Sequence, residues 1–153
     1  MDATAKVTRC WYAGADAIGA KCVVNSFPGH FPQIPEKNLQ ELMYNNLVRI
    51  FGVEHVLKEG GYSPASSDVG DVSSIIPTLQ ARIGGASGNA HSDYYRIVDK
   101  DNAYLDAAKA LALTVIDLLY DEAQEATKVV QEFQPVFTKD EYLKVWGRIG
   151  EQF

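Results

Sequence analysis

Residues 61–95 read GYSPASSDVGDVSSIIPTLQARIGGASGNAHSDYY, and the rest of the chain is organised around this stretch. It concentrates glycines, serines, short acids and one histidine between segments that are typical of a scaffold. Small residues let a backbone approach a ligand closely, while aspartate and histidine are side chains that titrate or bind metals near neutral pH. The stretch is therefore the predicted functional site.

Short strands are predicted on both sides of the serine-rich string. Residues 78–83 form an apolar run that ends at Gly84-Gly85, which is typical of a buried strand that delivers a loop. Upstream, residues 21–27 (KCVVNSF) are rich in β-favouring side chains and end at a Pro-Gly pair. The glycine loop is thus expected to follow the end of a strand.

Apolar residues at helical spacing predict amphipathic helices in the remaining segments. The expected helices cover residues 3–18, 38–51, 101–131 and 138–149. Asn38 is the expected N-cap of the second helix and Gly52 its stop, and Thr138 with Glu141 forms a capping box before the last one. Such wide apolar faces need a sheet or other helices to cover them, so partner surface is expected to be missing or shared.

The order of elements predicts the α/β class, with a boundary near residue 35. Three prolines between Pro28 and Pro35 exclude regular structure there and favour a stiff crossing between two bodies. The predicted division is therefore residues 1–35 and residues 36–153.

Composition excludes several function classes. The chain has 153 residues, 46% of them hydrophobic, and a formal net charge of −6, so it offers no basic footprint for nucleic acid. Two cysteines in this length favour free, buried thiols in a reducing compartment. No signal-like or membrane-spanning apolar run is present, because charges interrupt residues 103–120. A cytoplasmic protein that contacts no membrane is expected.

The central string carries a resemblance to a known family. Residues 65–73 (ASSDVGDVS), Ile76-Pro77-Thr78, Gly84-Gly85 and residues 89–92 (NAHS) resemble the C-terminal half of zinc-dependent amidohydrolases and peptidases of the aminoacylase/carboxypeptidase family. The likeness is greatest to the branch with p-aminobenzoyl-glutamate hydrolase and aminoacylase-1-like proteins. It extends over most of residues 20–125.

The resemblance implies a partial catalytic α/β domain with long C-terminal helices, preceded by the end of a lid domain. Residues 1–35 would be the end of the lid and the crossing segment, and residues 36–153 the C-terminal half of the catalytic domain. It gives His91 the role of a metal ligand and assigns no catalytic residue. The residues implied to contact substrate are Ser66, Ser67, Asp68, Asp71, Gly85 and Asn89.

The sequence departs from the family at the metal site. The family's His-x-Asp motif and glutamate general base are absent, and Ala65 and Ser67 replace the usual glycine and threonine. A hydrolytic zinc needs about three protein ligands, which His91 alone cannot supply. Zinc is therefore expected only together with an N-terminal half, and none with this chain alone.

Structural alternatives stand beside these roles. Asp68 and Asp71 are residue types that cap helices and form turns, so a structural role competes evenly with substrate contact. A metal site built from these two acids and His91 lacks a fourth group, and no nucleophile-elbow pattern surrounds Ser66 or Ser67.

Two function classes follow. In the first, the chain is the C-terminal portion of an amidohydrolase that cleaves a small amide, such as an N-acyl amino acid or a dipeptide-like compound, and is inactive alone. In the second, it is a truncated, non-catalytic relative that acts as a binding or assembly module. Either class predicts self-association or a complementary chain as partner.

Overall fold

The computed structural model describes residues 2–25, 29–61 and 66–149. They form two compact units, residues 1–29 with 139–153, and residues 30–138. The first unit contributes α1 (Asp2–Ala17) and α5 (Lys139–Ile149). The second contains, in chain order, α2 (Lys37–Phe51), the 3-10 turn η1 (Val53–His55), α3 (Asp68–Ser73), β1 (Ala86–Ser87), β2 (Arg96–Ile97), the π-helical turn η2 (Asp101–Asp106) and α4 (Ala107–Glu132).

The predicted α/β class is wrong, because the described structure is mostly helical. Its one sheet is an antiparallel pair, β1 with β2, of two residues each, in which Ala86 lies opposite Ile97. Residues 78–83, the predicted buried strand, form neither helix nor strand. A strand needs a neighbouring strand for its backbone hydrogen bonds. Among the described residues, no strand pairs with residues 78–83.

The other predicted strand, residues 21–27, is also not observed. Residues 21–25 are irregular, and the remainder of that prediction lies outside the described residues. The division at residue 35 into a lid and a catalytic half stays a prediction.

The helices follow the predicted periodicity closely. α1 ends just before Gly19, whose φ of 69° is a left-handed stop. α2 begins one residue earlier than expected because Glu36, and not Asn38, is its N-cap: the Glu36 carboxylate accepts a hydrogen bond of 2.7 Å from the Leu39 N–H. Gly52 ends the helix as predicted, with φ of 86°.

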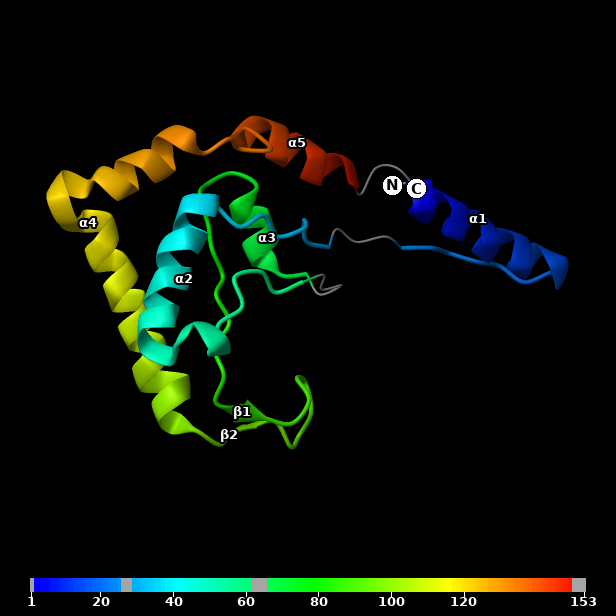
Figure 1. Ribbon diagram of the computed structural model, residues 1–153. Helices are drawn as coiled ribbons and strands as arrows, with labels where there is room; N and C mark the ends of the chain where they lie inside the picture. Colours follow the sequence, from blue (N-terminus) through cyan, green and yellow to red (C-terminus); the bar gives the residue numbers. More distant parts are fainter. Residues whose placement is uncertain (1, 26–28, 62–65, 150–153) are drawn as a thin grey trace. The chain divides into compact units, whose positions relative to one another are not determined.

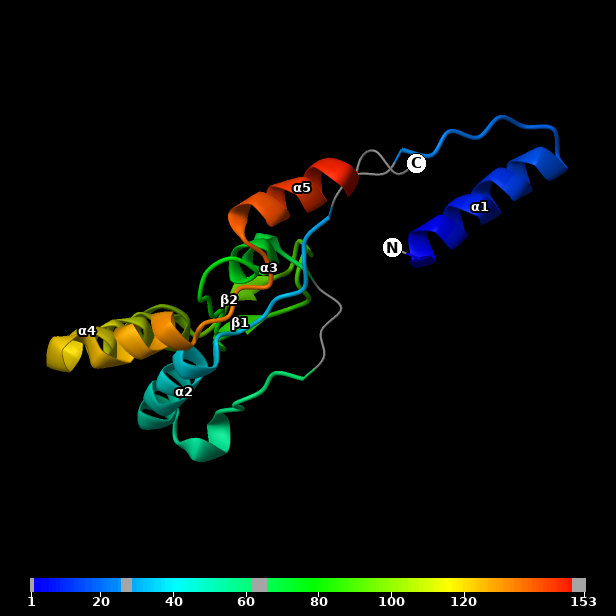
Figure 2. The ribbon, with the colours of Figure 1, turned by 90° about the horizontal axis from the view of Figure 1, so that it is seen from above.

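Unit 2 is built on the packing of α2 against α4, which lie side by side in both ribbon views (Figures 1 and 2). Asn46 is fully buried between them and donates hydrogen bonds to Thr114 Oγ1 (3.2 Å) and Asp117 Oδ2 (2.8 Å). The buried apolar side chains of the described residues are Met43, Ala110 and Val129. The core is therefore small and partly polar.

The long helix α4 is bent, as Figure 1 shows. Tyr120 is extended, and the next three residues, Asp121, Glu122 and Ala123, have φ between 50° and 59°. The left-handed conformation costs an L-residue about 1–2 kcal/mol, so the bend carries backbone strain. The sequence predicted one continuous helix here.

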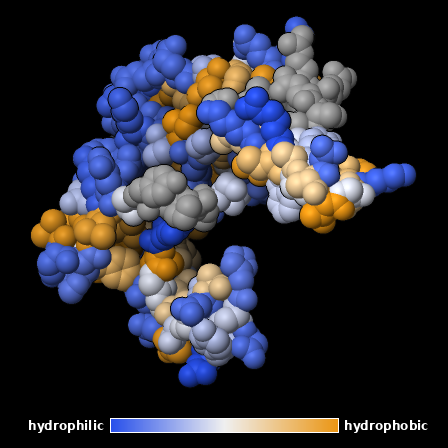
Figure 3. Space-filling view, turned by 90° about the vertical axis from the view of Figure 1, so that its right-hand side faces the viewer, coloured by the Kyte–Doolittle hydropathy of each residue, from blue (hydrophilic) through white to orange (hydrophobic). Residues whose placement is uncertain are grey.

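Many large apolar side chains remain exposed. On α4 they include Leu111 (60%), Ile116 (58%) and Leu119 (65%). Hydrophobic side chains reach the surface in several places in the space-filling view (Figure 3). Exposed apolar patches of this kind are often sites of protein–protein contact.

Candidate functional site

The serine-rich string folds as the short helix α3 and is packed against residues 31–34. A Cβ added to Gly70 would overlap the carbonyl oxygen of Phe31, so only glycine fits at this position. The Ser73 hydroxyl donates to the Gly70 carbonyl (3.0 Å) and accepts from the Ile34 N–H (3.1 Å). Ser74 donates to the same Gly70 carbonyl (2.9 Å). The C-terminal part of the string, from Gly70 to Ser73, is therefore held by specific contacts.

Asp71 is engaged by the segment that precedes α2. Its Oδ2 atom lies 2.7 Å from His30 Nδ1, and its Oδ1 atom accepts a 3.3 Å hydrogen bond from the Phe31 N–H. The Asp71 side chain is 13% exposed and that of His30 is 44% exposed. Carboxylates often orient a histidine in this way, by bonding one ring nitrogen and leaving the other accessible.

The remaining predicted residues of the string are more open. Ser66 and Asp68 are exposed, and Ser67 is half-buried as the N-cap residue of α3, without a capping hydrogen bond from its side chain. Of the two acids in the string, only Asp71 is bound to a neighbour in the described residues. Of the two roles that the sequence left open for Asp71, these contacts favour the structural one.

The glycine loop and His91 belong to the β1–β2 hairpin. Gly85 has φ of 103°, and a Cβ there would lie 2.6 Å from the Asp99 carbonyl oxygen. Asn89 donates a 2.9 Å hydrogen bond to the Tyr94 hydroxyl within the hairpin. His91 is exposed, with φ of 63°, a conformation that histidine adopts more readily than most residues.

The two groups of predicted residues are not brought together. Among the described residues, no hydrogen bond or ion pair joins the α3 string to the hairpin, and Figure 1 shows α3 and the hairpin at different places along α2. No three His, Cys, Asp or Glu side chains of the described chain are grouped to hold a metal ion. These residues do not by themselves fit a hydrolytic zinc site, which needs about three protein ligands.

A large cleft of about 1060 Å³ lies in unit 2, lined by α2, the turn after it and residues 78–84. Of the residues predicted to contact substrate, Ser66 lines this cleft, whereas Asp71 does not. His91, the predicted metal ligand, does not line it either. His30, which has no role predicted from the sequence, also lines the cleft while its Nδ1 atom contacts Asp71. His30 is recognised as a candidate site residue only through its contact with Asp71, which lies 41 positions later in the sequence. No sequence motif around His30 indicates this contact.

One cation of the cleft is already neutralised. The Lys58 ammonium donates to the Glu41 carboxylate, and this hydrogen bond raises the pKa of Lys58 above its usual value of 10.5. The same ammonium lies 5.6 Å from the centre of the Tyr44 ring. Both contacts hold the ammonium of Lys58 near side chains of α2.

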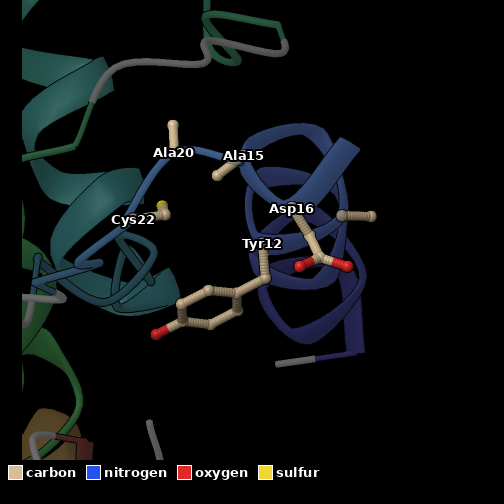
Figure 4. Close-up of a pocket in the computed structure, with 6 residues that line it drawn as sticks. Tyr12, Ala15, Asp16, Ala20 and Cys22 are labelled. Atoms are coloured by element: carbon tan, nitrogen blue, oxygen red, sulfur yellow. The ribbon is translucent and has the colours of Figure 1, made fainter. Parts of the chain in front are cut away.

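A second, shallow pocket lies beside α1 (Figure 4). Tyr12 and Asp16 reach it from the helix, and Ala20 and Cys22 from the segment that follows. Cys10 is exposed and Cys22 half-buried, so the thiols are free as expected but not buried. No hydrogen bond of the described residues links these side chains into a site.

Comparison of the chain with family models, with characterised proteins and with solved structures gave no match. The family resemblance accordingly stays a prediction. No helix in the described parts of the chain combines the length and the apolar character that crossing a membrane requires.

Proposed function

We propose that this chain is the C-terminal portion of a metal-dependent amidohydrolase or peptidase. Its substrate class is a small amide, an N-acyl amino acid or a dipeptide-like compound. The chain supplies one wall of the site, and a complementary chain supplies the remaining metal ligands and the general base.

The observation that carries the proposal is the string from Ser66 to Ser73 and the way it folds. Gly70 is too close to Phe31 for any side chain, and Ser73 is 2% exposed and hydrogen-bonded both to Gly70 and to Ile34. Two of the residues on which the resemblance rests, Gly70 and Ser73, are thus fixed by the local packing. This packing supports a string with a defined conformation that places Ser66 at the cleft.

The exposed position of His91 and the exposed apolar side chains of α4 support the need for a complementary chain. His91 is exposed on the hairpin, where a metal ion held mainly by another chain has access to its ring. The uncovered apolar residues of α4 provide area for association. Because the described residues do not fit zinc alone, no step of the hydrolysis is assigned to this chain by itself.

The second candidate function is a non-catalytic binding or assembly module. It is favoured by the engagement of Asp71, whose two oxygens contact His30 Nδ1 and the Phe31 N–H, contacts that suit a structural role. In this alternative the same exposed faces are buried by self-association.

Activity measurements separate the two functions. The chain alone, with zinc, should not hydrolyse N-acetyl amino acids or dipeptides. Mixing it with the N-terminal half of a p-aminobenzoyl-glutamate hydrolase, which carries His-x-Asp and the general base, should give hydrolysis. His91→Ala should abolish that activity, whereas Asn45→Ala should not, because Asn45 is exposed on α2 and does not line the cleft.

Hydrolysis by the chain alone would show that its site is complete and would contradict the proposal. Binding of the N-terminal half without any hydrolysis would favour the non-catalytic module. Equal losses in His91→Ala and Asn45→Ala would remove the metal-binding role of His91.

A further inference from the structure

The connection between α3 and β1 has unpaired backbone groups. At one end, the Thr78 carbonyl accepts a 2.9 Å hydrogen bond from the Glu36 N–H, and at the other, the Gly85 carbonyl accepts one of 2.8 Å from the Val98 N–H. Between these anchors, the N–H and C=O groups of residues 79–83 make no hydrogen bond in the part of the chain that the structure describes. Figure 1 shows this connection running lengthwise from α3 down to β1. Unpaired backbone N–H and C=O groups in an elongated segment can pair with an added strand, as they do at the exposed edge of a sheet.

The same residues form one wall of the large cleft in unit 2. Leu79 and Ile83 contribute half-buried apolar side chains to it, and Leu57, which also lines the cleft, is 86% exposed. The α2 side of the cleft is also apolar, with Met43, Leu47 and Phe51. Because side chains alternate along an extended strand, a strand added here would place every second side chain against this apolar wall.

The basic side chains that line the cleft are partly balanced by acids just outside the cleft. Its ionisable lining residues in the described chain, apart from Tyr44, are His30, His55, Lys58 and Arg82, with no aspartate or glutamate, although the chain carries a net charge of −6. Lys58 is paired with Glu41. His30 Nδ1 lies 2.7 Å from Asp71, and His55 Nε2 lies 3.6 Å from Glu54. Arg82 is exposed and has no hydrogen-bond or ion-pair partner among the described residues. Its planar guanidinium suits a carboxylate, which it can bind through two hydrogen bonds.

We propose that residues 79–83 bind an extended segment of another polypeptide as an added β-strand. The bound segment carries apolar side chains at alternate positions, which fill the cleft, and an Asp or Glu between them, which pairs with Arg82. The inference concerns the cleft alone and does not rest on the amidohydrolase function.

A peptide of defined pattern tests the proposal. The probe is acetyl-Val-Glu-Val-Glu-Val-amide, titrated into the full chain while amide resonances and hydrogen exchange are followed. The expected result is saturable binding, with slowed exchange of the amides of residues 79–83. The same peptide N-methylated at alternate residues keeps its side chains but loses half of its backbone donors, and it should not bind.

Substitutions test the charge. Arg82→Gln should weaken binding of the glutamate peptide at least about tenfold, because a charge-assisted hydrogen bond is lost. Arg96→Gln is the matched control, since Arg96 is also exposed but lies on β2 outside the cleft. Arg82→Glu should reverse the preference toward a peptide with lysine in place of glutamate.

Three results would overturn the proposal. The first is no binding, or binding that leaves exchange at residues 79–83 unchanged. The second is displacement of the peptide by acetyl-glutamate at similar concentration, which would make a small carboxylate the ligand. The third is self-association of the chain that the peptide reverses, which would identify a second copy as the occupant.

Discussion

Gly70 is the residue at which a side chain is least tolerable. A methyl group there would meet the Phe31 carbonyl oxygen, and backbone atoms cannot move aside as a flexible side chain can. Gly70→Ala should therefore lower the free energy of unfolding by about 2 kcal/mol or more, measured by urea denaturation. Gly60→Ala is the control, because a Cβ on Gly60 meets nothing within 4 Å, and a change beyond about 0.5 kcal/mol is not expected. Equal stability of the two variants would contradict the packing described for α3.

Asn46 joins α2 to α4 through its buried amide. Its Nδ2 donates to Thr114 and Asp117, and its Oδ1 accepts a 3.1 Å hydrogen bond from Arg49. Asn46→Ala leaves these partners unsatisfied and a cavity behind, so it should cost about 2–3 kcal/mol of unfolding free energy. The neighbouring Asn45 is exposed on the same helix, and Asn45→Ala should be near neutral. Similar effects of both substitutions would show that α2 does not face α4 through Asn46.

The sequence predicted the structural roles of some residues and missed those of others. Gly52 was identified as a helix stop because helix ends are local features. The roles of Asn46 and His30 depend on partners at least 41 positions away, so spacing could not reveal them. Asn46 does interrupt the apolar stripe of α2, and that was the available signal. The metal-binding role of His91 stays a prediction.

Among the elements, the bend in α4 gives the prediction that is easiest to test. Glu122 is left-handed, where glycine has no Cβ penalty, so Glu122→Gly should leave unfolding free energy unchanged or raise it by about 1 kcal/mol. Lys128 is exposed in the regular part of the same helix, and Lys128→Gly should lower it by about 1 kcal/mol. Both changes are measured by urea denaturation, and a loss of the same size at both positions would mean that the helix is continuous at Glu122.

Elements were predicted well where periodicity alone defines them. α1, α2 and α5 appear within a residue or two of their predicted bounds because an amphipathic helix closes its own hydrogen bonds. The strand predicted at residues 78–83 was wrong because a strand depends on a partner strand, which the apolar composition of the segment cannot specify. The bend at residues 120–123 contains no glycine or proline from which it could be predicted.

On the scale of the whole molecule, exposed apolar surface is the dominant feature. Leu111 and Leu119 of α4 are 60% and 65% exposed, and they should drive association. Replacing both with glutamine should reduce self-association in sedimentation velocity and reduce binding of a hydrophobic dye, with little loss of helix content. Leu143→Gln on α5, where the side chain is 54% exposed, is the control. A chain that stays monomeric at high concentration and binds no dye would contradict a role for the α4 face.

The central claim is that this chain holds only part of a metal-dependent site. A calorimetric zinc titration tests it most directly, with the chain alone and with the N-terminal half that carries His-x-Asp. The chain alone should bind no zinc tightly, whereas the mixture should bind zinc tightly, and His91→Ala should weaken that binding. Tight binding of zinc by the chain alone, unaffected by His91→Ala, would contradict the central claim.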